Sequence, residues 1–349
     1  MFQKWGHSAA LFFYSVSFYV LIPVIITRLL FKSLKSPMYR IRLRERWGFV
    51  PRRSDENLVF WVHAVSVGES VAATPMIKAL CANNRELRVH VTCMTPTGSQ
   101  RIRSIFSDQL GKTITHSYAP YDLPDSVRRF LGRIRPAMLI VMETELWPNI
   151  ISLCSKKNIP IVLANGRMSE KSANGYERYA FFTRRIFQQL SSVAAQTDVD
   201  AARFIRLGAP ESCITVTGNI KFDMVIENSL RQAARHLRSR LCARGERPIW
   251  VAASTHAGEE KIVLDAFFSA RKKIFNLLLV ITPRHPERFK GVFRMCTSRG
   301  FRVALSSSMP TDGEFDILVG DTMGELMAYY GACDIAFVGG SLVPVGGHS

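Results

Sequence analysis

One glutamate stands where an α/β enzyme would place a general base. The apolar run Leu58–Val62 predicts a strand and Ser70–Leu80 predicts the next helix, which puts Glu69 in the first helical turn. Open α/β sheets bind ligands at the carboxyl ends of their strands, and a carboxylate there can remove a proton from a bound hydroxyl. The alternative is that Glu69 only stabilises the helix N-terminus through the helix dipole.

Small and hydroxyl-bearing residues accompany this position. Ser66 and Gly68 precede the glutamate, and we expect Gly68 to let the backbone turn sharply or approach a ligand closely. After the next predicted strand, Thr97, Gly98 and Ser99 open a helix, an arrangement that suits an anion or a sugar. Thr97 and Ser99 can equally be helix N-caps and nothing more.

Two later loops repeat the pattern of an apolar strand followed by polar residues. Glu143 and Glu145 follow one strand and suggest acid–base work or binding of sugar hydroxyls. Alternatively, Trp147 and its neighbours only begin the next helix. Arg167 follows another strand and is a candidate partner for a carboxylate.

The second half of the chain offers features that bind nucleotide phosphate. Arg284 supplies positive charge, and glycine-rich loops after apolar strands permit close approach of backbone N–H groups. The sequence contains neither a P-loop nor a G-x-G-x-x-G motif, so ATPase and hydride-transfer chemistry are not supported.

These loops need two α/β domains to position them. Seven apolar runs between residues 58 and 217, and five between 249 and 338, alternate with helical patterns such as Gly175–Leu190. Such alternation predicts doubly wound parallel sheets. We therefore expect a membrane anchor and basic collar over 1–53, a first Rossmann-like domain over 54–222 and a second over 223–349.

The N-terminal segment predicts attachment to a membrane. Ser8–Thr27 carries no charge, and its 20 residues are long enough to cross a hydrocarbon core. Basic residues then accumulate, which places the rest of the chain in the cytoplasm by the positive-inside rule. A helix that lies flat in the membrane surface is the alternative. The collar either fixes topology only or also holds the protein against anionic lipid head groups.

Composition excludes several other classes of protein. The chain has 349 residues, of which 47% are hydrophobic, so it is not disordered. Its seven cysteines form no C-x-x-C pair, which fits a reducing compartment and argues against a structural zinc site. The net charge is +18, half of it within 1–53. No nucleic-acid recognition module accompanies this charge, and the pairs Arg128-Arg129 and Arg184-Arg185 are interpreted as solvated helix faces.

Taken together, these loops resemble the 3-deoxy-D-manno-octulosonic acid (Kdo) transferases of lipopolysaccharide synthesis. Eight motifs carry the resemblance in chain order, and they cover essentially the whole sequence. They are Ser66–Glu69, Met94–Ser99, Tyr121–Pro124, Glu143–Asn149, Ser254–Glu260, Pro283–Phe289, Val319–Leu326 and Phe337–Leu342.

The resemblance implies a GT-B glycosyltransferase, with two Rossmann-like domains facing a cleft, anchored at the cytoplasmic face of the inner membrane. It implies transfer of Kdo from CMP-Kdo to the lipid A disaccharide precursor, with inversion, without a metal or other cofactor, and with Glu69 as the general base. The implied donor-binding residues are Pro283, Arg284, Met323, Gly324, Glu325, Gly346, Gly347 and His348. The implied acceptor- or sugar-binding residues are Ser66, Gly68, Thr97, Gly98, Ser99, Glu143, Glu145 and Arg167.

One departure from the family pattern concerns the C-terminus. The pattern continues from Gly-Gly-His into Asn-Pro-Leu-Glu and a further stretch, whereas here Ser349 follows His348. We therefore expect an incomplete second domain. Two alternatives to Kdo transfer stay open: a membrane-anchored, non-catalytic remnant that binds lipid or partner proteins, and a transferase that uses another nucleotide sugar.

Overall fold

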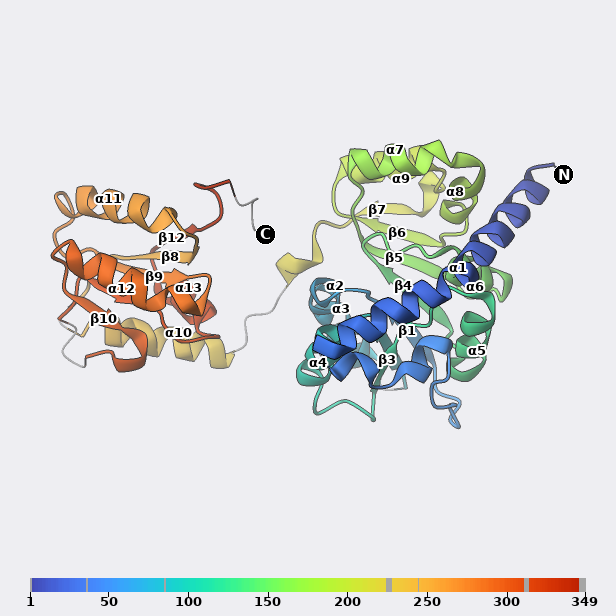
Figure 1. Ribbon diagram of the computed structural model, residues 1–349, viewed down its shortest axis with the longest axis horizontal. Coiled ribbons are helices and arrows are strands. Elements are labelled where there is room, and N and C mark those ends of the chain that lie inside the picture. The colour runs from blue at the N-terminus through green and yellow to red at the C-terminus, as the bar shows by residue number, and fades with distance from the viewer. Residues whose placement is uncertain are drawn as a thin grey trace. The chain divides into compact units, whose positions relative to one another are not determined.

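The chain folds into two α/β units, Met1–Met224 and Val225–Ser349. The computed structural model describes residues 2–35, 37–84, 86–223, 228–243, 245–310 and 314–344, with side chains from residue 8 onward except Lys35. Each unit is built on one parallel sheet with helices on its faces (Figure 1). Each is described below by itself.

The first unit contains a seven-stranded sheet in the order β3-β2-β1-β4-β5-β6-β7. Every pairing is parallel. The central strands β1, β2, β4 and β5 are buried on both faces, which explains their continuous apolar runs. All seven predicted strands are present. Their bounds are β1 Val59–His63, β2 Arg88–Cys93, β3 Ile114–Tyr118, β4 Met138–Met142, β5 Ile161–Gly166, β6 Ser192–Ala195 and β7 Ile214–Val216.

Two helices predicted for the first unit differ from the helices in the structure. The helix expected over Ser70–Leu80 is two helices that meet at Ala73, where Pro75 occupies the first turn of the second. The helix expected over Gly175–Leu190 starts earlier, at Glu170, and is interrupted at Tyr179. The helices are α1 Phe2–Lys35, α2 Val67–Ala72, α3 Thr74–Asn83, α4 Pro96–Ile105, α5 Pro124–Ile134, α6 Pro148–Lys156, α7 Glu170–Arg178, α8 Ala180–Phe187 and α9 Asp198–Leu207.

The second unit contains a five-stranded parallel sheet in the order β10-β11-β9-β8-β12, and all five predicted strands are present. Its strands are β8 Ile249–Thr255, β9 Leu278–Pro283, β10 Val303–Leu305, β11 Ile317–Val319 and β12 Ile335–Val338. Its helices are α10 Asn228–Leu241, α11 Glu259–Arg271, α12 Phe289–Ser298 and α13 Leu326–Ala332.

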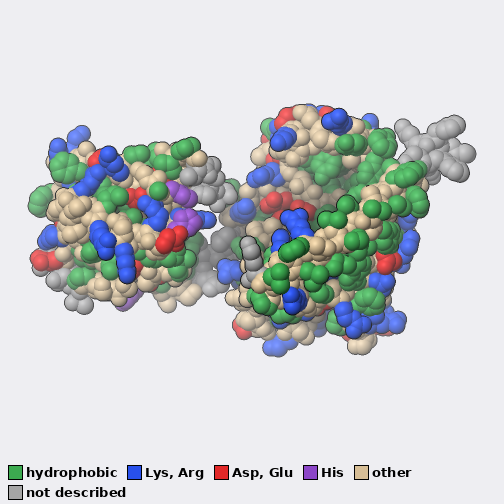
Figure 2. All heavy atoms as spheres, viewed as in Figure 1, with side chains coloured by type: hydrophobic (Ala, Val, Ile, Leu, Met, Phe, Trp, Pro, Cys, Tyr) green, Lys and Arg blue, Asp and Glu red, His purple; other side chains and the backbone are tan. Residues whose placement is uncertain are grey.

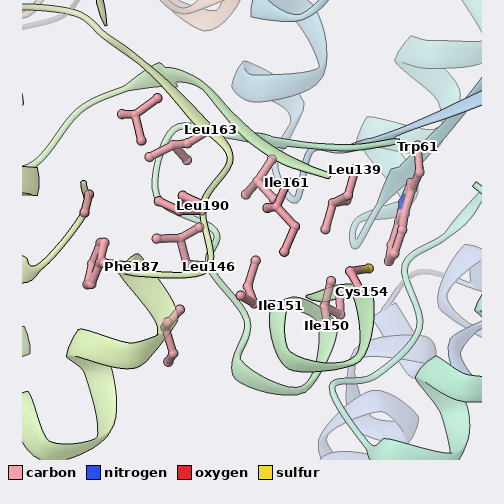
Figure 3. Close-up of a cluster of buried hydrophobic side chains, with 14 of the residues drawn as sticks. Trp61, Leu139, Leu146, Ile150, Ile151, Cys154, Ile161, Leu163, Phe187 and Leu190 are labelled. Atoms are coloured by element: carbon pink, nitrogen blue, oxygen red, sulfur yellow. The ribbon is translucent and has the colours of Figure 1, made fainter. Parts of the chain in front are cut away.

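The larger core of the first unit holds the acidic loop after β4 in place. Leu146, from that loop, is 6% exposed and packs among buried side chains of β1, β4, β5, α6 and α8 (Figure 3). Trp61 of β1 and Phe187 of α8 are fully buried in the same cluster. Because Leu146 is fixed in this core, the polar residues on either side of it have little freedom to move.

Helix α1 lies along the first unit and leaves an apolar face exposed (Figure 1). Ser15 donates to the Asn149 side chain at 3.2 Å, and the Tyr14 and Phe182 rings are 6.1 Å apart. Phe13 and Val20 of α1 are 69% and 70% exposed. Hydrophobic side chains line the exposed surface of this helix (Figure 2). Among the described residues, Ser8–Leu34 is the one helical stretch with the length and apolarity needed to cross a membrane.

Two arginines of the basic collar are structural. The collar continues from α1 through short 3-10 helices at Pro37–Arg40 and Leu43–Trp47. Arg46 is 2% exposed, donates to the Met94 carbonyl at 2.9 Å and lies over the Tyr118 ring. Arg42 donates to the His116 carbonyl and the Ser99 hydroxyl, each at 3.1 Å. These two guanidiniums bind the collar to β3 and α4, so they are not available to lipid head groups.

Candidate active site

The candidate site lies where the strand order of the first sheet reverses. β1 pairs with β2 on one side and with β4 on the other, so the connections after β1 and β4 diverge. Ligands of open α/β sheets bind at this topological switch point. The loop after β1 carries Ser66 and Glu69, and the loop after β4 carries Glu143 and Glu145. The structure therefore brings together two of the loops that the sequence singled out.

The Glu69 carboxylate is buried and held by two donors. It is 7% exposed, accepts the Val65 N–H at 2.7 Å and accepts the Ser66 hydroxyl at 2.6 Å. Ser66 is the N-cap of α2, and its Oγ accepts the Glu69 N–H at 3.2 Å. Ser66 thus caps the helix as in a capping box, except that the glutamate accepts the N–H of Val65, one residue before the N-cap. This arrangement satisfies the helix end and also fixes the carboxylate, which keeps lone pairs available for a proton.

Glu143 and Glu145 add negative charge near the Glu69 carboxylate. The Trp147 indole donates to Glu145 Oε2 at 2.9 Å. Burial raises the pKa of Glu145, and the charges of Glu69 and Glu143 raise it further, against the opposing effect of the indole hydrogen bond. Glu143 has a positive φ of 54°, a conformation that non-glycine residues adopt at a cost and that gathers at functional sites. The charges of Glu69 and Glu143 therefore reach Glu145 at this sheet edge.

A buried histidine under the site was missed as a candidate. His63 ends β1, is fully buried, and packs edge-on against the Trp147 ring at 4.7 Å between centroids. Burial lowers its pKa to about 3, so the imidazole is neutral at physiological pH. Within the described residues its Nε2 has no hydrogen-bond partner. The signal in the sequence was a polar residue closing an apolar strand immediately before the candidate motif.

Gly68 does not make the sharp turn that was expected. It is an exposed residue inside α2 without a positive φ, and a Cβ added to it would meet only Ser66 Oγ, at 3.8 Å. The backbone therefore tolerates a side chain here. Close approach of a ligand to Gly68 stays a prediction.

Replacing Gly68 with alanine is expected to affect the stability of the protein and its transfer activity in different ways. The folded protein should be as stable or up to about 1 kcal/mol more stable, because alanine is the better helix former. If a ligand approaches the backbone here, the added methyl group raises KM or lowers kcat. Thermal unfolding and steady-state transfer kinetics on the same preparation measure both. Unchanged kinetics would show that no ligand lies against Gly68.

The residues after β2 serve mainly to organise the loop. Thr95 is the N-cap of α4 and accepts the Gly98 N–H at 3.1 Å, so the expected capping by Thr97 or Ser99 is wrong. Ser99 is 4% exposed and is bonded to His116 Nε2 at 2.8 Å. Thr97 is exposed, and its hydroxyl donates to Thr95 Oγ1 at 3.4 Å.

Arg167 does not meet a carboxylate. Its side chain is exposed, and it forms no ion pair within the part of the chain that the structure describes. Its neighbour Asn165 has a positive φ of 55° and is 3% exposed. The Asn165 side chain accepts the Ile220 N–H at 3.1 Å, so it fastens the segment after β7 to the end of β5.

The second unit has its own switch point, between β8 and β12. Glu259, at the start of α11, is fully buried and accepts the N–H groups of His256, Gly340, Ser341 and Leu342 at 2.8 to 3.1 Å. This single carboxylate holds the loops after β8 and β12 together.

The predicted donor-binding residues fall on the strand ends of this unit. Pro283 ends β9 and is buried, and Arg284 follows it with an exposed side chain. Met323 is 74% exposed, so its side chain is accessible from solvent. The next residue, Gly324, has φ +91°. Hydrogen bonds from Thr322, Ser306 and Tyr329 lower the pKa of Glu325, although its partial burial opposes them.

Three predicted donor residues, Gly346, Gly347 and His348, lie outside the described residues. Among the residues that are described, no group of three or more His, Cys, Asp or Glu side chains has the geometry to hold a metal ion.

Similarity to known proteins decides the family. The sequence pattern described as 3-deoxy-D-manno-octulosonic-acid transferase (kdotransferase) matches residues 41–224. The 3-deoxy-D-manno-octulosonic acid transferase of Haemophilus influenzae is 41% identical over 340 residues, which are 97% of this chain and 78% of that one. The chain belongs to the Kdo transferase family.

Another Kdo transferase, from Bordetella pertussis, is 35% identical over 295 residues, 83% of this chain and 67% of its own length. The structure of UDP-GlcNAc 2-epimerase from Neisseria meningitidis has a TM-score of 0.53 at 14% identity and covers 80% of this chain and 76% of its own. That likeness shows the shared two-unit α/β architecture of the GT-B type. The Kdo transferase described here is accordingly a glycosyltransferase of lipopolysaccharide synthesis.

Proposed function

We propose that this Kdo transferase moves Kdo from CMP-Kdo to the disaccharide lipid A precursor, with Glu69 as general base. The observation that carries the proposal is the buried Glu69 carboxylate, oriented by Val65 and Ser66 at the switch point of the first sheet. The first unit would bind the acceptor, and the second would bind the nucleotide sugar through Pro283 and Arg284 and through the loop Met323–Glu325.

The reaction needs one proton transfer and one displacement. The Glu69 carboxylate takes the proton of an acceptor hydroxyl as the hydroxyl oxygen attacks the anomeric carbon of Kdo. The bond from that carbon to the CMP phosphate oxygen breaks, CMP leaves with the electron pair, and attack from the opposite face inverts the configuration. Arg284 can neutralise charge on the departing phosphate, and the proposal requires no metal ion.

The negative charge of Glu143 and Glu145 favours this assignment. Both follow β4 at the sheet edge that carries Glu69. Their oxygens can accept hydrogen bonds from the hydroxyl groups of a sugar. The proposed location is the cytoplasmic face of the inner membrane, with α1 as the anchor, because its apolar face is exposed and a basic segment follows it.

The test is a transfer assay with the full chain purified in detergent. The chain is incubated with CMP-Kdo and the lipid A disaccharide precursor, and the mass of the lipid product is measured by mass spectrometry. We expect the mass of one or more Kdo residues to be added. Transfer only from a different nucleotide sugar would overturn the proposed donor. Binding of the precursor by the folded chain without any turnover would instead favour a non-catalytic remnant.

A further inference from the structure

We propose that a cavity beside α1 binds the phosphate group of an anionic membrane lipid. The cavity has a volume of about 520 Å³ and lies between α1, α5, α6 and α8. Three of its lining residues are cations, Arg128, Lys156 and Arg185, and none is acidic. Each cation comes from a different helix, so the fold itself gathers them.

These cations differ from the other basic residues around them. Within the described residues, none of the three forms an ion pair, whereas the adjacent Arg129 is paired with Asp125 at 3.1 Å. Arg129 is thus used within the fold, whereas Arg128 is exposed and lines the cavity.

The remaining polar lining suits a phosphate. Ser152 and Ser155 add hydroxyl groups that can donate to phosphate oxygens. Arginine and lysine form their strongest hydrogen bonds with charged acceptors such as phosphate. A cavity with several donors, three positive charges and no carboxylate selects an anion.

The position of the cavity selects an anion that carries an acyl chain. Leu11 and Phe12 of α1 form part of its wall, and Phe12 is 63% exposed. Further hydrophobic side chains gather along the exposed surface of α1 (Figure 2). A lipid can place its phosphate on the cations and its chain on Phe12. Free inorganic phosphate can use only the first of these contacts.

The experiment measures lipid binding by the full chain in detergent, by isothermal titration calorimetry. The probes are short-chain phosphatidylglycerol, short-chain phosphatidylcholine, a phosphorylated lipid A disaccharide precursor and inorganic phosphate. The cavity variant is Arg128→Gln/Lys156→Gln/Arg185→Gln. The control variant, Lys157→Gln/Lys171→Gln/Arg178→Gln, removes the same charge at exposed positions that do not line the cavity.

We expect phosphatidylglycerol to bind, and the cavity variant to bind it at least about tenfold more weakly because its charge-assisted hydrogen bonds are lost. The control variant should change affinity by less than about threefold. The single variant Lys156→Gln, at an exposed helix end, repeats the test with minimal risk to folding. Binding of the lipid A precursor alone, with the same dependence on the cavity, would support the site and identify the acceptor as the source of the phosphate.

Three outcomes would overturn the inference. The first is binding of inorganic phosphate or phosphatidylcholine as tight as that of phosphatidylglycerol. The second is an equal loss of affinity in the control variant and the cavity variant. The third is that no anionic lipid binds. Because none of these readouts depends on turnover, failure here is distinguishable from failure of the proposed transferase reaction.

Discussion

Glutamine in place of Glu69 is expected to reduce kcat for Kdo transfer by about 10²–10⁴-fold, the usual contribution of a general base, while the fold stays intact. Glutamine and glutamate both serve as the third helical residue of a capping box. The amide oxygen can still accept the Val65 N–H that Glu69 accepts at 2.7 Å. It cannot take up a proton, so the substitution removes the chemistry and keeps the contact.

Two further variants separate the role of Glu69 in catalysis from its role in the helix cap. Ser66→Ala removes the N-cap hydroxyl and leaves the carboxylate, and it should cost about 1 kcal/mol of stability with a smaller effect on kcat. Glu69→Ala removes both functions. Single-turnover transfer assays and thermal unfolding of all three measure the two effects separately. A Glu69→Gln protein that still turns over at a substantial rate would show that Glu69 is a capping residue only.

The largest expected loss of stability follows from Glu259→Gln in the second unit. The buried carboxylate accepts backbone N–H groups with both oxygens, at 2.8 Å from His256 and from Gly340. A glutamine turns one of these oxygens into an NH₂ group that faces N–H donors. Leaving buried polar groups unpaired costs about 1–3 kcal/mol each, so we expect a loss of about 3 kcal/mol or more.

Hydrogen exchange of the full chain at neutral pH measures this loss where it occurs. Amides of β8 and β12 should exchange faster in Glu259→Gln, while amides of β1 in the first unit serve as an internal reference. Glu287→Gln, at an exposed position of the same unit, is the matched control. Equal protection in the two variants would contradict the structural role of Glu259.

The same carboxylate predicts a dependence of stability on pH. Burial opposes ionisation of Glu259, but the surrounding N–H donors outweigh it and lower its pKa below the ordinary 4.5. A lowered pKa in the folded state gives stability that is present above the ordinary pKa and is lost as pH falls through the lower, folded value. Acid unfolding of the second unit should therefore be less steep in Glu259→Gln.

The fold was predictable because parallel strands buried on both faces are continuous apolar runs. Errors arose where one helical pattern covered two helices. Pro75 is compatible with the first turn of a helix, so the break at Ala73 can be recognised from the proline but does not interrupt the apolar periodicity. The interruption at Tyr179 has no glycine or proline to signal it.

The site was predictable in its main residue and only partly in its surroundings. Ser66 and Glu69 form a local S-x-x-E pattern that reads as a capping box directly in the sequence. The contact between His63 and Trp147 joins residues 84 positions apart and depends on β1 and β4 being neighbours. Likewise, only the folded chain shows that Arg42 reaches Ser99 and that Glu259 holds the glycine loop.

The contacts between α1 and the first unit connect the proposed membrane anchor to the candidate active site. Asp122, 1% exposed, accepts the first N–H groups of α6 from Asn149 and Ile150, and burial raises its pKa to about 6 despite those bonds. Asn149 in turn accepts from Ser15 of α1, and α6 begins directly after the acidic loop. With α1 in the membrane as proposed, this rigid linkage sets the height of Glu69 above the lipid surface. Acceptors would then be chosen partly by how far their reactive hydroxyl stands out from the bilayer.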